Sequence, residues 1–156
     1  MKPITRIKRE LSLELARQIR ARDTACFMNA LQALALLKDP TARYVEGYAL
    51  DIKGLPVVFY HGWVECEDGR GKYIVETTPS WLGKGKTHYF AGIRYTHTEI
   101  LAKVHKRGAR LPVNSGELRL VDENRAAHDA ASKLLYGPEV FERLSQMAGW
   151  DRQNSR

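Results

Sequence analysis

Cysteine is scarce in this sequence: Cys26 and Cys66 are the two in 156 residues, and no CxxC pair occurs. Two cysteines are too few for a fold built on disulfides, and the missing pair argues against a zinc ribbon or a thiol redox motif. No apolar run reaches the roughly 20 residues that a membrane-spanning helix needs. Charges also interrupt the first residues, where a signal peptide would have its apolar core. We therefore expect a cytoplasmic protein without membrane contact.

The composition is that of an ordinary globular domain, with 44% hydrophobic and 28% charged residues. A chain of this length can bury one core, so residues 1–156 are expected to form a single domain. Lys and Arg exceed Asp and Glu by 25 − 18 = 7, and two stretches, residues 1–22 and 84–110, carry this excess. Such segments favour contact with nucleic acid or an acidic partner, although a solvated charged face is the commoner explanation.

Hydrophobic periodicity predicts two helices in the first quarter of the chain. Residues 8–21 repeat leucine or isoleucine at four-residue steps, which is typical of an amphipathic helix. Residues 25–37 are apolar on nearly every side, which predicts a helix at the centre of the domain with Asp23 or Thr24 as its N-cap. Cys26 is then expected at the second or third position of that helix.

Three strands are predicted next, at 42–52, 56–66 and 72–78, from β-branched and aromatic residues between turn signals. Their short connections indicate an antiparallel meander. In the second strand, the alternation of side chains places His61 on the same face as Trp63 and other large apolar residues.

The C-terminal part is predicted to be mainly helical. After a strand at 88–95, Thr96 and Glu99 have capping-box spacing and indicate the start of a helix. Asp122 is a candidate cap for a further helix, and Gly137-Pro138 separates it from a last short one. The expected fold class is α+β: N-terminal helices, including a central Cys-bearing helix, packed on an antiparallel sheet, with C-terminal helices.

Cys26 and His61 are the candidate catalytic pair. A helix N-terminus stabilises a thiolate through its N–H groups and the positive end of the helix dipole, and the same N–H groups can bind an oxyanion. A histidine on a neighbouring strand would act as the base. Both residue types are more often structural in such positions. Cys66 lies among acidic residues that disfavour its thiolate, so it is an internal control.

Four segments occur in an order that resembles the transglutaminase-like superfamily, which is related to papain. They are CFMNAL (26–31), ARYVEGYAL (42–50), HGWVE (61–65) and TTPSW (77–81), followed by YFAGIRY. The resemblance covers roughly residues 22–95, and residues 96–156 are expected to form a helical extension. It implies that Cys26 is the nucleophile. It also implies that His61 takes the thiol proton and later returns one to the leaving group.

The residue that orients the histidine departs from the family pattern. The family's aspartate precedes the proline of its turn, and the matching position here is Thr78. A threonine hydroxyl can accept the imidazole N–H but has no charge to stabilise an imidazolium. Glu76 is the acidic alternative, but it lies two residues earlier, roughly 6.6 Å of strand, unless a bulge or register shift moves it. Trp63 and Trp81 are the candidate substrate-binding residues.

The expected function is that of a cysteine-dependent hydrolase or acyltransferase acting on an amide bond of a peptide or protein. No cofactor or metal is implied. The alternative is a catalytically inactive member of the fold that binds a protein or nucleic acid through its basic segments. In that case, charge reversal at Lys84, Lys86 and Arg94 should weaken binding in a salt-dependent way, and Cys26→Ser should not.

Overall fold

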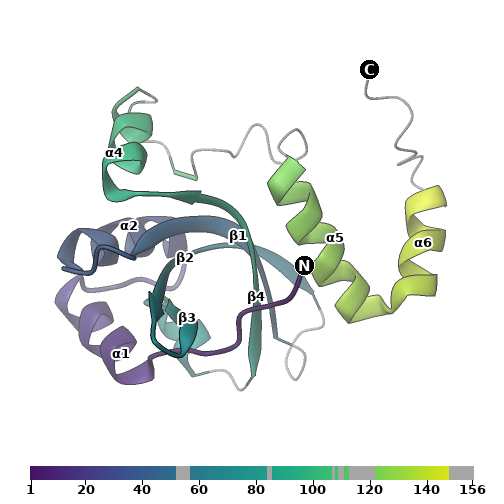
Figure 1. Cartoon of the computed structure of the whole chain (residues 1–156), viewed down its shortest axis with the longest axis horizontal. Helices are drawn as coiled ribbons and strands as arrows, with labels where there is room; N and C mark the ends of the chain where they lie inside the picture. The colour runs from purple at the N-terminus through teal and green to yellow at the C-terminus, as the bar shows by residue number, and fades with distance from the viewer. Residues whose placement is uncertain (52–56, 84–85, 107, 109–110, 113–121, 148–156) are drawn as a thin grey trace.

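The computed structural model describes residues 1–51, 57–83, 86–106, 108, 111–112 and 122–147. The elements follow the order α1 (Arg9–Gln18), α2 (Cys26–Leu36), β1 (Arg43–Asp51), β2 (Val58–Asp68), β3 (Gly71–Val75), α3 (Pro79–Leu82), β4 (Thr87–Tyr95), α4 (His97–Lys106), α5 (Asp122–Tyr136) and α6 (Pro138–Met147). The predicted α+β class is confirmed: N-terminal helices, including the Cys26 helix, pack on a four-stranded antiparallel sheet, and C-terminal helices follow (Figure 1).

The sheet has the strand order β3-β2-β1-β4, and every neighbouring pair is antiparallel, which confirms the meander of the first three strands. The sheet is strongly curved, and the first residues of the chain run along both of its outer strands (Figure 1). Ile4 exchanges two backbone hydrogen bonds with Tyr89 of β4, of 2.9 and 3.0 Å. Two residues on, Arg6 O accepts from Ile74 N of β3 at 2.8 Å, and Lys8 N donates to Ile74 O at 3.0 Å. These bonds close the curved sheet into a ring.

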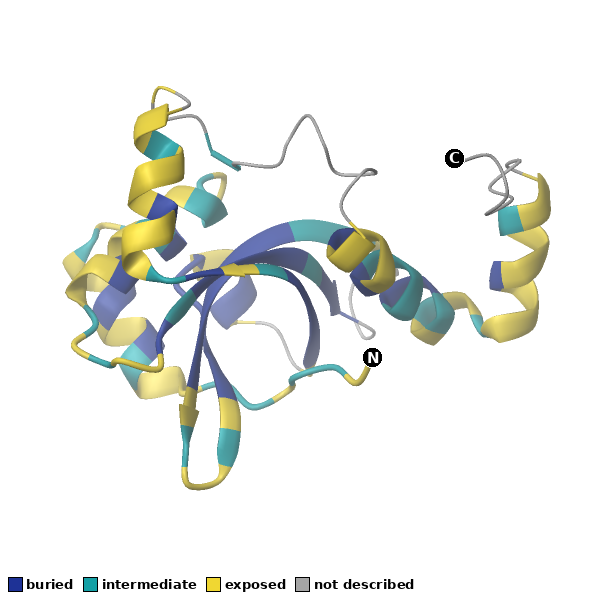
Figure 2. Cartoon of the chain, turned by 45° about the horizontal axis from the view of Figure 1, so that its top comes forward, coloured by how far each residue is buried: buried dark blue, intermediate teal, exposed yellow. Residues whose placement is uncertain are grey.

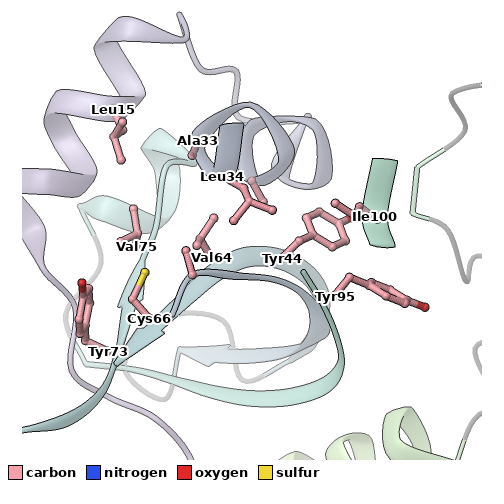
Figure 3. Close-up of a cluster of buried hydrophobic side chains, with 12 residues drawn as sticks. Leu15, Ala33, Leu34, Tyr44, Val64, Cys66, Tyr73, Val75, Tyr95 and Ile100 are labelled. Carbon is pink, nitrogen blue, oxygen red and sulfur yellow. The ribbon is translucent and has the colours of Figure 1, made fainter. Parts of the chain in front are cut away.

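Buried side chains form clusters on both faces of the sheet. The outer cluster lies under α1, α2 and α4 and includes Leu15, Ala33, Leu34, Tyr44, Val64, Cys66, Val75 and Ile100 (Figure 3). The cluster inside the ring includes Val45, Ala49, Trp63, Ile74, Trp81, Tyr89 and Ala91. Trp63 and Val64 belong to different clusters, as the alternation of side chains along the second strand predicts.

Helix α2 differs from its prediction in how far it is buried. One face packs on the sheet, but Met28 and Leu36 are 39% and 47% exposed on the other. The helix therefore lies at the side of the sheet, because no further layer covers its outer face in the described part of the chain (Figure 2).

The start of α2 also differs from its prediction. The N-cap is Ala25, and the described residues supply no side-chain cap, so the predicted caps Asp23 and Thr24 were wrong. Asp23 instead accepts the backbone N–H of Ser80 at 2.5 Å, which ties the segment before α2 to the first turn of α3. Cys26 is consequently the first residue of the helix, one or two positions earlier than predicted.

The C-terminal helices extend from the sheet. The capping box before α4 is confirmed, since Thr96 N donates to Glu99 Oε2 at 2.8 Å and Glu99 N donates to Thr96 Oγ1 at 3.2 Å. Asp122 is the first residue of α5 rather than its cap. α5 packs on β1 and β4, and α6 packs on α5 with most of its surface exposed (Figure 2). None of the helices in the described ranges is long and apolar enough to cross a membrane.

Candidate active site

Cys26 is half-buried at the start of α2, next to strand β2. The close approach depends on Gly62, because a Cβ atom at that position would lie 2.6 Å from Phe27 Cδ1 and 3.0 Å from Phe27 Cα. The first N–H groups of an α-helix have no acceptor within the helix. Cys26 is the first residue of α2, so its side chain starts from the end of the helix where these groups and the positive end of the dipole lie.

The structure brings Cys26 and His61 together. The Cys26 side chain is within hydrogen-bonding reach of the His61 ring, which projects from the middle of β2. His61 is only 2% exposed, and its Nε2 atom lies 2.8 Å from Glu76 Oε2. Nδ1 is therefore the ring nitrogen left for Cys26. The predicted thiol and imidazole are in contact, from one helix terminus and one strand.

Glu76, and not Thr78, holds the far side of the imidazole. Glu76 is fully buried, and its carboxylate accepts hydrogen bonds from Thr78 N at 2.8 Å and from Tyr89 Oη at 3.0 Å as well as contacting His61. Among the described residues, the buried Thr78 hydroxyl has no hydrogen-bond partner. The predicted orienting role of Thr78 is therefore not supported, whereas Glu76 has the required contact.

The position of Glu76 follows from where strand β3 ends. Val64 pairs with Val75, and continuing that register would set Thr78 opposite His61. However, β3 ends at Val75, and Glu76 N donates to Ser12 Oγ of α1 at 3.1 Å instead of to β2. Beyond the end of the strand pairing, the Glu76 carboxylate reaches His61. Glu76 makes this contact without a bulge or a register shift in the pairing of β2 and β3.

The surroundings of His61 decide its charge. Burial alone would lower its pKa, because the charged ring is less well solvated away from water. The Glu76 carboxylate and the hydrogen bond with Cys26 outweigh burial and raise the pKa of His61 to about 9. His61 is therefore an imidazolium at neutral pH.

Both predicted substrate-binding tryptophans lie against the imidazole. The Trp81 ring centroid is 4.8 Å from that of His61, and the Trp63 centroid is 6.2 Å away and stacked. Trp63 is fully buried and Trp81 is 8% exposed. In this structure they are the wall that holds the imidazole and excludes water from it. Their contact with a substrate stays a prediction.

Cys66 has the surroundings of an unreactive thiol. It is 1% exposed in the outer cluster (Figure 3), and burial raises the pKa of its thiol to about 11, with a further contribution from Asp39. The acidic neighbours in sequence, such as Glu65 and Glu67, are not among the causes of this shift. The pKa is raised as predicted, but burial is the larger reason.

The basic segments have partners of their own. Arg94 donates to both carboxylate oxygens of Glu65, at 3.0 and 3.1 Å. Arg6 and Lys8 pair with Asp68 at 2.8 and 3.3 Å. These pairs reduce the charge available to a polyanion. Lys84 lies outside the described residues, and binding of nucleic acid or an acidic partner stays a prediction.

Tyr89 and Ser12 are site residues that the sequence patterns did not indicate. Tyr89 Oη donates to Glu76, and burial together with the Glu76 charge raises the pKa of Tyr89 well above its usual value, so the hydroxyl keeps its proton. Ser12 fixes the Glu76 backbone. Tyr89 belongs to the YFAGIRY segment, so its motif was noticed but its role was not.

The fold and site define an α+β protein with a thiol, an imidazole and a buried carboxylate in series. Comparisons of the chain with models of protein families, with curated proteins and with solved structures gave no match.

Proposed function

We propose that the protein is a cysteine-dependent hydrolase or acyltransferase of the transglutaminase-like kind, acting on an amide bond. The observation that supports this most is the series Cys26, His61 and Glu76, in which one ring contacts both the sulfur and a buried carboxylate. A thiol, a base and an orienting acid in hydrogen-bond contact are the arrangement that nucleophilic catalysis needs.

In this reaction the Cys26 thiolate attacks the carbonyl carbon of the amide and forms a tetrahedral intermediate. Its oxyanion is stabilised by N–H groups at the start of α2, where each donor typically contributes a factor of about 10² to 10³ in rate. The intermediate collapses with cleavage of the C–N bond. His61 gives its proton to the leaving amine, and the acyl group remains on Cys26 as a thioester.

The second half of the reaction regenerates the enzyme. Water or an amine loses a proton to His61 and attacks the thioester carbonyl, and the C–S bond then breaks to release the Cys26 thiolate. Glu76 stabilises the imidazolium throughout and keeps the ring oriented, because its carboxylate is itself fixed by Tyr89 and Thr78. No other group needs to gain or lose a proton.

Selective alkylation tests the reactive pair. Iodoacetamide is added to the folded protein at pH 6.5, and the modification of each cysteine is followed by mass spectrometry of peptides. Cys26 should react at least about tenfold faster than Cys66, because thiolate at neutral pH requires a positive neighbour and exposure. His61→Asn should remove most of this difference. Glu76→Gln is the second variant, in case the first does not fold as judged by circular dichroism.

Equal rates for the two cysteines would contradict the proposal, as would a Cys26 rate that is unchanged in both variants. The inherent control is Cys66, since it is in the same chain and its surroundings involve none of the three site residues. Its rate should stay the same throughout.

A further inference from the structure

A row of aromatic rings begins beside the nucleophile and crosses the sheet on the side opposite the catalytic imidazole. Phe27 of α2 is 5.1 Å from Tyr60 of β2, Tyr60 is 5.4 Å from Tyr48 of β1, and Tyr48 is 5.1 Å from His128 of α5, all between ring centroids. We call these four residues the aromatic row. Phe27 directly follows Cys26, so the row starts at the residue next to the proposed nucleophile.

All four members of the aromatic row are half-buried, unlike the aromatic residues of the core. Tyr44, Trp63 and Tyr89 are fully buried. Tyr48 and Tyr60 are direct cross-strand partners, which keeps their rings side by side on one face of the sheet. Each of these four residues therefore keeps part of its surface exposed to another molecule.

Two carboxylates lie along the row, one at Tyr60 and one at its far end. Tyr60 Oη donates to Glu46 Oε2 at 2.8 Å, and Glu46 also accepts from Tyr44 Oη at 3.0 Å. At the far end, His128 Nδ1 lies 3.6 Å from Asp129 Oδ1. Burial and the Glu46 charge raise the pKa of Tyr60, so its hydroxyl remains a donor. A phenol that donates to a carboxylate has a more electron-rich ring, and such rings attract cations over their faces.

We propose that the aromatic row is a substrate subsite for a cationic side chain, an ammonium or guanidinium group, close to the amide that Cys26 attacks. The proposal rests on the proposed function for its orientation, because that function makes Cys26 the reacting end. Charge complementarity favours a cation: the row combines partly exposed aromatic residues with the Glu46 carboxylate at the Tyr60 hydroxyl and Asp129 beside His128. The preferred substrates are then peptides with Lys or Arg beside the cleaved or transferred amide.

A binding experiment tests the subsite without relying on catalysis. The Cys26→Ser protein is titrated with the peptide acetyl-Gly-Lys-Gly-amide and with the matched norleucine and glutamate peptides, and binding is followed by NMR chemical shifts. The lysine peptide should bind about threefold to thirtyfold more tightly than the norleucine peptide, the range expected for a cation over aromatic faces. The shifts should concentrate at Tyr48, Tyr60 and their neighbours.

Substitutions in the row distinguish the contribution of the aromatic ring to binding from that of the hydroxyl group. Tyr48→Leu should remove the preference for lysine, and Tyr60→Phe should reduce it because the hydroxyl that donates to Glu46 is then absent. Tyr136→Leu is the matched control, since Tyr136 is a 47% exposed tyrosine of α5 outside the row. Equal affinity for the lysine and norleucine peptides, or an unchanged preference in Tyr48→Leu, would overturn the proposal.

The two proposals fail separately. If the lysine peptide binds at the row but Cys26 reacts no faster than Cys66, the subsite stands and the enzymatic function is refuted. If Cys26 is selectively reactive but the peptides bind equally, the enzymatic function stands and the cationic preference is refuted.

Discussion

Glu76→Gln should convert His61 from an imidazolium to a neutral ring at physiological pH. The pKa of His61 is raised to about 9, against an ordinary value of about 6.5. At about 1.4 kcal/mol for each tenfold change, the site favours the charged ring by about 3 kcal/mol. Burial is the largest single influence on the pKa of His61, and it lowers that pKa. Removal of the Glu76 carboxylate should therefore bring the pKa to 6.5 or below.

The assay is a pH titration of the His61 ring by NMR, in the parent protein and in Glu76→Gln. A group with a pKa of 9 is almost fully charged at pH 7.5, whereas one with a pKa of 6.5 is charged in roughly one molecule in ten. The rate of Cys26 alkylation at pH 7.5 should fall by a similar factor. The same titration in a Cys26→Ser background shows how much of the shift comes from the sulfur.

Two results of this titration would contradict the prediction. A His61 pKa that stays above about 8 in Glu76→Gln would show that another group holds the charge of the ring. A parent pKa near 6.5 would show that burial balances the carboxylate, and the thiolate would then lack a positive partner at neutral pH.

Two other predictions follow from the same site. Gly62→Ala should destabilise the protein by about 1–3 kcal/mol and slow the alkylation of Cys26, because the new Cβ would displace the first turn of α2. Gly69→Ala is the control and should change neither property, because a Cβ at Gly69 would have nothing within 4 Å. Urea unfolding measures the stability, and mass spectrometry measures the alkylation rate. The raised pKa of His61 should make the free energy of unfolding fall as pH rises: the stabilisation is complete below about pH 6.5 and lost by about pH 9, and amounts to about 3 kcal/mol. Urea unfolding at pH 6.5, 8 and 9.5 measures this fall. The prediction is refuted if the free energy of unfolding changes with pH equally in the parent protein and in Glu76→Gln.

The strand that carries His61 could be predicted because its pattern is local. Alternation along 56–66 sets the faces of β2, and that alone places His61 inside the ring with Trp63. The capping box of Thr96 and Glu99 was equally local. These features depend on residues a few positions apart, so no knowledge of the tertiary structure was needed.

The orienting residue could not be settled in this way. Whether Thr78 or Glu76 reaches His61 depends on where β3 ends, and that end is fixed by Ser12, a residue of another element that is 64 positions away. The start of α2 was misjudged for a similar reason. Asp23 has the chemistry of a cap, but the backbone of Ser80 in α3 uses its carboxylate.

The bonds that Ile4 and Lys8 make with the two outer strands impose an order on biosynthesis. These residues leave the ribosome before their partners, because Ile74 follows Lys8 by 74 − 8 = 66 residues and Tyr89 follows Ile4 by 89 − 4 = 85. Until then the nascent segment has no docking position, and both strand borders stay open to association with other chains. A chain lacking residues 1–8 would keep these borders open permanently, and we expect it to aggregate before it loses its secondary structure.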